Sequence, residues 1–258
     1  GFIMKRAKYL VLMLLVPLLI LGGCGKKETK YYDSEFITAL EQGLQDRWAI
    51  SDTLKDPGNI SKDSASKMVD AELKAVKDYP NKKFKNAKLH EQALAYVNAV
   101  KEQQATIKKY NSNSFITLWN KAYDKRTKAI LSINKIHKLK VDPKYESNLT
   151  ELTRNGDQAA NKDKQNQQID QLVKTIKFKL TKNDYGYKTY AANVKNTTDF
   201  SFKQFDVNVK LLNAKKTVVE TQFIPISDWD KGQTNRFEFS TDKEFTNYKV
   251  VKEFIEQK

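Results

Sequence analysis

The stretch Val173-Lys174-Thr175-Ile176-Lys177-Phe178-Lys179-Leu180 is where the spacing of apolar residues changes along the chain. From Ile176 onward, apolar residues alternate with lysines, which is the two-residue period of a β-strand with one buried face. Before this stretch, apolar residues recur about every four positions, which is the period of an amphipathic helix. The sequence therefore predicts an α+β fold, with helices first and strands after them.

The part that precedes the change, residues 34–152, is predicted to be an N-terminal α-helical bundle. Its first helix ends near Ser51 and has an apolar residue at every fourth position. Further helices are expected after Ser61, over 87–110 and over 115–138, with a shorter helical stretch around 145–152. The core of this domain is predicted to contain Phe36, Leu40, Leu44, Trp48, Trp119 and Ile130.

Residues 153–168 contain almost no large apolar side chain and are rich in Asn, Gln, Lys and Asp. This composition indicates either a linker or an exposed helix. We place the domain boundary here and expect an extended or mobile segment. The alternative is one continuous polar helix that runs on to Val173.

The part that follows, residues 169–258, contains six or seven short alternating segments separated by turn residues. Such a pattern is typical of an antiparallel, immunoglobulin-like β-sandwich. The predicted core of this domain consists of Phe178, Val194, Val207, Val209, Leu211 and Phe239.

The first residues of the chain have the pattern of a secretory signal peptide, with Met4 as the expected start. Three basic residues precede an apolar run from Tyr9 to Leu21, which is shorter than the roughly 20 residues that span a membrane. Leu21-Gly22-Gly23-Cys24 then resembles the lipobox of bacterial lipoproteins. The resemblance implies that residues 1–23 are a signal peptide cleaved between Gly23 and Cys24.

Cys24 is then expected to carry a diacylglyceryl group that holds the chain on the extracytoplasmic face of the cell membrane. It is the only cysteine of the chain, so no internal disulfide can form, and lipidation accounts for a thiol outside the cell. Two acyl chains give lasting attachment where one would be marginal. Residues 24–33 are predicted to be the lipidated tether.

The chain is strongly basic, with a formal charge of +15, of which +12 remains in the 235 residues after the predicted cleavage. The charge is mostly lysine spread along the sequence, and an exported protein rarely meets nucleic acid. We therefore predict no nucleic-acid partner and expect attraction to anionic lipids or cell-wall polymers, or contact with another envelope protein. Lys26, Lys27 and Lys30 lie beside the anchor and add about 1 kcal/mol each near an anionic surface.

The C-terminal part resembles the FxLYD family of small β-sandwich domains of bacterial lipoproteins. The matching segments are Val194-Lys195-Asn196-Thr197, Val209-Lys210-Leu211-Leu212-Asn213 and Lys231-Gly232-Gln233. Of the name-giving motif only Leu211 is retained, because Val209, Leu212 and Asn213 replace Phe, Tyr and Asp. In the N-terminal part, Phe36-Ile37 and Leu44-Gln45-Asp46-Arg47-Trp48 look like helical lipoproteins of low-GC Gram-positive bacteria. Both resemblances imply location and fold, and neither brings an active site.

The chain carries no catalytic motif that we recognise. Its two histidines, His90 and His137, have no partner at ligand spacing, so we predict no metal and no cofactor. Asp228 and Asp230 flank Trp229 in a polar loop, and this is the best candidate for an exposed aromatic contact, although packing of Trp229 at the end of the sandwich is the somewhat favoured alternative.

We expect a non-catalytic binding or scaffold lipoprotein of the cell envelope. A solute-binding lipoprotein of a transporter is the alternative, and an envelope hydrolase ranks below it.

Overall fold

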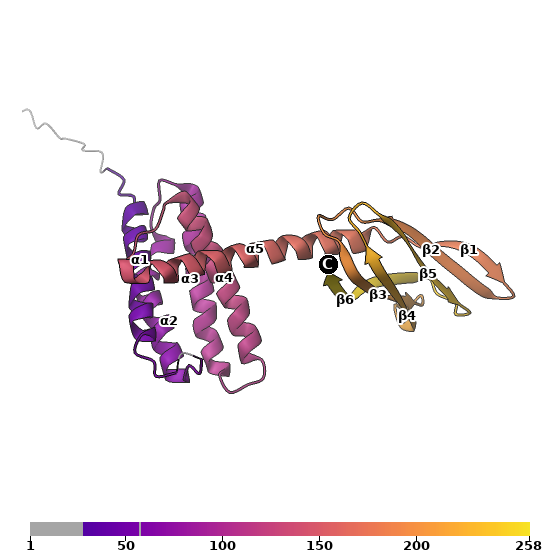
Figure 1. The fold of residues 1–258 in the computed structure, drawn as a ribbon, viewed down its shortest axis with the longest axis horizontal. Coiled ribbons are helices and arrows are strands. Elements are labelled where there is room, and N and C mark those ends of the chain that lie inside the picture. The colour runs from indigo at the N-terminus through magenta and orange to yellow at the C-terminus, as the bar shows by residue number, and fades with distance from the viewer. Residues whose placement is uncertain (1–27, 57) are drawn as a thin grey trace, which may run out of the picture.

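The structure is a computed structural model that describes residues 28–56 and 58–258. The fold is α+β as predicted: five α-helices come first and two antiparallel three-stranded sheets follow (Figure 1). Gly23 and Cys24, with the predicted cleavage and lipidation, lie outside the described residues. Within those residues, none of the helices has the length and apolar character needed to span a membrane.

The first four helices begin and end close to the predicted positions, and the fifth runs well past the expected short stretch around 145–152. They are α1 (Asp33–Ser51), α2 (Lys62–Val76), α3 (Ala87–Thr106), α4 (Phe115–Ile136) and α5 (Glu146–Lys174). Side-chain caps fix two of the starts, because Ser61 accepts a hydrogen bond from the Ser64 amide and Asn86 accepts one from the Leu89 amide. Such caps satisfy amides that have no partner inside the helix.

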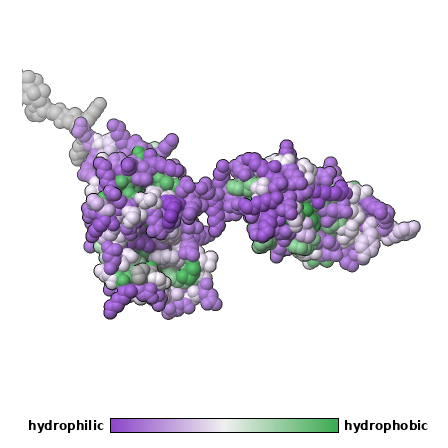
Figure 2. Space-filling model, in the orientation of Figure 1, coloured by the Kyte–Doolittle hydropathy of each residue, from purple (hydrophilic) through white to green (hydrophobic). Residues whose placement is uncertain are grey.

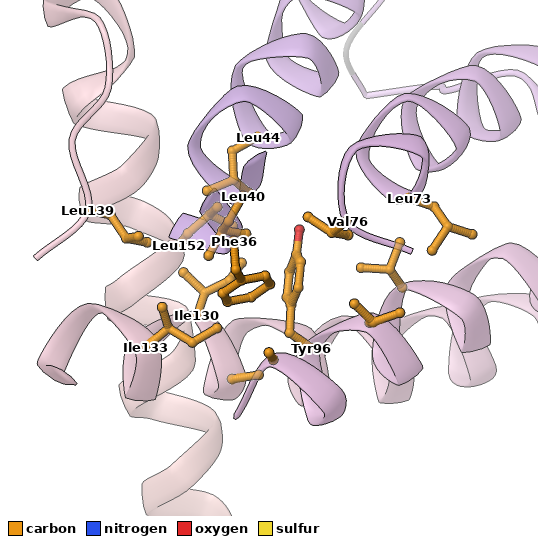
Figure 3. Close-up of a cluster of buried hydrophobic side chains, with 14 of the residues drawn as sticks. Phe36, Leu40, Leu44, Leu73, Val76, Tyr96, Ile130, Ile133, Leu139 and Leu152 are labelled. Carbon is orange, nitrogen blue, oxygen red and sulfur yellow. The ribbon is translucent and has the colours of Figure 1, made fainter. Parts of the chain in front are cut away.

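The first four helices pack around one apolar core, to which the start of α5 also contributes (Figure 3). The four-residue spacing of Phe36, Leu40 and Leu44 puts all three on one face of α1, where each is fully buried. The predicted core is confirmed for Trp48 and Ile130 as well. Trp119 is only partly buried and packs against the edge of the cluster.

The strands form two sheets that share a second apolar core. They are β1 (Lys179–Asp184), β2 (Tyr187–Lys195), β3 (Phe202–Leu212), β4 (Val218–Trp229), β5 (Thr234–Thr241) and β6 (Asn247–Gln257). One sheet has the strand order β1-β2-β5 and the other β4-β3-β6. The alternation predicted along β3 is confirmed, because Phe205, Val207, Val209 and Leu211 are all fully buried. The other predicted core residues of this part, Phe178, Val194 and Phe239, are buried too.

Residues 153–168 belong to α5, so the expected extended segment is wrong and the alternative of a continuous helix is correct. The segment is not featureless, because Leu152, Gly156 and Ala159 recur on the face that packs against α4 and are buried. Small residues allow the two helices to approach closely. Composition alone does not distinguish a helix that packs through small residues from a polar linker. At the other end of α5, Ile169, Leu172 and Val173 enter the core between the sheets.

Contacts to both parts meet at adjacent residues of α5. Asp163 pairs with Lys128 of α4, and Lys164 next to it pairs with Asp199 between β2 and β3 at 3.2 Å. Gln168 and Asp199 also bond reciprocally, at 2.9 Å through the side chains and 2.8 Å to the Asp199 amide. The hydrophilic neck that joins the two parts in Figure 2 is therefore a helix held at both ends.

Candidate functional site

Trp229, predicted as a candidate exposed contact, is fully buried between the sheets. Its ring meets Phe205 edge to face at 5.1 Å and Phe237 at 5.4 Å, and its Nε1 donates to the Gln233 carbonyl at 2.9 Å. The backbone at Asp228 has a φ of 51°, outside the strand region, so the alternation along β4 shifts by one residue and turns Trp229 inward. The prediction of an exposed aromatic contact is wrong, and the alternative of packing at the end of the sheets is correct.

Asp228 and Asp230 are exposed and share one cation. The Lys258 ammonium lies 3.4 Å from Asp228 and 2.8 Å from Asp230. The hydrogen bond from Lys258 and its charge lower the pKa of Asp230, and the same contact raises the pKa of Lys258. The two carboxylates thus hold Lys258, which follows β6, against the end of β4. Among the described residues, no three His, Cys, Asp or Glu side chains gather as metal ligands would.

The two histidines lie apart and neither joins a site. His90 stacks on Phe84 at 4.8 Å, and its Nε2 lies 2.8 Å from the Pro80 carbonyl oxygen. His137 is exposed just after the end of α4.

The most exposed aromatic residue lies at the tip of the β1–β2 hairpin, which the sequence identified only as a turn. Tyr185 is completely exposed, and Tyr187 and Leu180 are more than half exposed. Positive φ values of 50° at Tyr185 and 91° at Gly186 make a two-residue turn of the kind that suits the twist of a hairpin. All six residues of β1 are exposed, and Figure 1 places this hairpin at the end of the molecule farthest from α1.

Aromatic side chains that reach into water are typical anchors of protein contacts. The hairpin therefore presents a small, amphipathic and largely preformed surface. The two tyrosines on either side of Gly186, Tyr185 and Tyr187, are the sequence signal that could have identified it.

A buried network of charges crosses the helical part. Glu72 of α2 is fully buried and accepts hydrogen bonds from Arg47 Nη1 at 2.7 Å, from Arg126 Nε at 2.7 Å and from the Tyr96 hydroxyl. Arg47 Nη1 also donates to Gln103 Oε1 at 3.1 Å. The network thus joins α1, α2, α3 and α4 through polar contacts inside an apolar core.

The electrostatics of this network follow from burial and from the two guanidiniums. Burial opposes ionisation of Glu72, but the charges of Arg126 and Arg47 outweigh it and lower the pKa of the carboxyl group. Burial, together with the charge of Glu72, raises the pKa of Tyr96 well above its usual value, so the phenol stays protonated and donates. From the sequence, Arg47 stood out only as a neighbour of Trp48. Glu72 and Arg126 were missed because single charged residues inside helical segments look like surface residues.

Comparisons with protein-family models, with curated proteins and with solved structures find no match to this chain.

Proposed function

We propose that this protein is a lipid-anchored, non-catalytic protein of the bacterial cell envelope that presents a contact surface at a distance from the membrane. The anchor is Cys24 in the lipobox-like Leu21-Gly22-Gly23-Cys24. The partner is an envelope protein or a cell-wall polymer. Anionic lipids attract the lysines beside the anchor.

The finer description of the two parts belongs to the same proposal. The helices form an N-terminal bundle next to the membrane. The strands form an immunoglobulin-like sandwich related to the FxLYD family. The strand orders β1-β2-β5 and β4-β3-β6 support this proposal, because they correspond to strands A-B-E and C′-C-F of an immunoglobulin domain.

The single observation that carries the proposal is the exposed Tyr185–Tyr187 tip at the far end of α5. The helix has 29 residues and is therefore about 44 Å long. The N-terminal side of the described chain and the hairpin tip lie at opposite ends of the molecule (Figure 1). A protein fixed at its N-terminus would hold this tip away from the membrane.

The test compares capture by the described chain, residues 28–258, with capture by the double variant Tyr185→Ser, Tyr187→Ser. Membranes and purified cell wall from the producing bacterium are separate targets. The matched control is Phe223→Ser, which removes a half-exposed aromatic from β4 of the other sheet.

Binding that the double variant loses and the control keeps is the expected result, with a loss of about tenfold or more for a central aromatic anchor. Equal binding by all three proteins, or binding to neither target, contradicts the proposal. Turnover of peptidoglycan or esters by the wild-type chain would contradict its non-catalytic part.

A further inference from the structure

A pocket lies at the end of the helical part where α2 and α4 begin. Its walls come from the segment 58–60 before α2, from the turn between α3 and α4, and from the first two turns of α4. Its volume is about 360 Å³, which falls within the range of sites that hold small molecules.

Three aromatic rings form most of the wall. The Tyr110 and Phe115 ring centres are 4.9 Å apart, and those of Phe115 and Trp119 are 5.6 Å apart. Ile60 and Ile116 complete the lining. Phe115 is buried, but Trp119 is only partly buried and Ile116 is 62% exposed. The pocket therefore presents apolar surface to solvent, which is the kind of surface that marks a binding site.

The described residues that line this pocket carry no charge, although 30% of the residues in the chain are charged. Other hollows, along α3 and α4, are lined by Glu102 and Lys125. An ion that entered the uncharged pocket would lose water without gaining a counter-charge, which is costly. The lining therefore selects an uncharged occupant.

The hydroxyl groups of the lining are already used to hold the walls. Tyr110 donates its proton to the Ile60 carbonyl at 2.5 Å, and Ser112 donates to the Lys109 carbonyl at 2.8 Å. Asn59, which is exposed, adds a side-chain amide to the lining. The pocket thus suits a ligand with an apolar body and a single polar group.

We propose that this pocket binds one uncharged aromatic molecule of about one ring, with a hydroxyl or a ring N–H. Aromatic walls favour an aromatic ligand, because offset and edge-to-face ring contacts add to the gain from burying apolar area. The hydrogen bond between Tyr110 and Ile60 fixes two of the walls in advance, so binding orders few side chains and costs little entropy.

The test is a titration of ¹⁵N-labelled residues 28–258 with phenol, followed through the indole N–H signals. Of the three tryptophans, only Trp119 lines the pocket, and Trp229 is buried between the sheets. The Trp119→Phe variant identifies the Trp119 signal by its absence. We expect a saturable shift of the Trp119 signal while the Trp229 signal stays in place.

Two further probes define the class of ligand. Benzoate has a similar ring but carries a charge, so it should bind at least about tenfold more weakly than phenol. Cyclohexanol has the hydroxyl on a saturated ring and should bind about threefold more weakly or worse.

Ile116→Ser removes an apolar side chain from the lining and should raise the half-saturating concentration of phenol several-fold. Leu94→Ser is the matched control, because Leu94 is also exposed on a helix, at 45%, and does not line the pocket. This control should bind phenol as the wild type does. Both positions are exposed, and circular dichroism matched to the wild type shows that each variant is folded.

The proposal is overturned if phenol does not shift the Trp119 signal saturably, or if Ile116→Ser and Leu94→Ser bind phenol equally. Benzoate or cyclohexanol binding as tightly as phenol would overturn the assigned class of ligand. The titration involves neither Cys24 nor the hairpin, so its failure leaves the proposed function untouched.

Discussion

Gly156 decides how closely α5 approaches α4, and its replacement by alanine tests that contact. A Cβ at this position would lie 2.8 Å from the Thr127 carbonyl carbon and 3.0 Å from the Leu131 Cβ, and still closer to the Thr127 oxygen. Nonbonded carbon atoms prefer about 3.5 Å or more. The clashing atoms of Thr127 belong to the backbone of α4, so no side-chain rotation can relieve the contact. Restoring about 3.5 Å between the two carbon atoms requires the helices to separate by about 0.7 Å.

Two opposing terms determine the net effect of Gly156→Ala. Alanine is favoured over glycine inside a helix by about 0.8–1.0 kcal/mol. Against this, overpacking costs about 1–3 kcal/mol, and a gap of 0.5–1 Å forfeits about a quarter to a half of the attraction between the atoms it separates. The separation of the helices would also lengthen the contacts that Leu152 and Ala159 make with α4. We expect the variant to lower the free energy of unfolding of the helical part by about 1–2 kcal/mol.

The assay is urea unfolding followed by far-ultraviolet circular dichroism, with Ala160→Gly as the matched control. Ala160 is exposed in the same helix, so its replacement should cost only the helix propensity, about 1 kcal/mol. A Gly156→Ala protein that is more stable than wild type would show that α4 and α5 are not in backbone contact at this position.

Further predictions concern the core between the sheets, the buried charges, one exposed carboxylate and the anchor. Trp229→Ala should destabilise the sheet part by about 3–5 kcal/mol, seen as early loss of its dispersed amide signals in urea; a loss below about 1 kcal/mol would contradict its burial. Glu72→Gln leaves two buried guanidiniums without a counter-charge and should destabilise the helical part by about 3–5 kcal/mol, measured by denaturation; a near-neutral effect would refute the network. Hydrogen bonds from Gln168, Lys164 and Lys231 lower the pKa of Asp199 to about 2, so its contribution to stability is present above the unfolded value of about 3.9 and is lost as the pH falls toward 2. The difference in stability between wild type and Asp199→Asn should shrink over that range, and a difference that stays constant would exclude the contact. Cys24→Ala should abolish metabolic labelling with a fatty acid, and retained label would refute the anchor.

Periodicity predicted the elements well where burial is one-sided. The four-residue spacing along α1 and the alternation along β3 each correspond to a face that is fully buried, and such patterns are set by packing against a single core. The order of the helices and strands and both sets of core residues followed from this. Trp119 departs from it because it lies at the edge of the cluster, where an apolar stripe reaches solvent.

The failures arose where a single residue changes the rule. The positive φ of Asp228 shifts the alternation and buries Trp229, and a backbone angle of this kind has no signature in hydropathy. Gly156 and Ala159 form a contact face of small residues on α5. Because these residues are not strongly apolar, the segment that contains them was predicted to be a linker. Glu72 and Arg126 lie 54 positions apart, and only the fold reveals that their charges meet.

The pairing of Asp163 with one part and Lys164 with the other has a mechanical consequence. Adjacent residues of one helix form ion pairs with the helical part and with the sheet part, so no flexible linker separates the two parts. A pull on the Tyr185 tip would load α5 directly, because Ile169, Leu172 and Val173 of this helix are packed in the core between the sheets. The α4–α5 contact at Gly156 therefore lies on the path of any load that passes between the two parts.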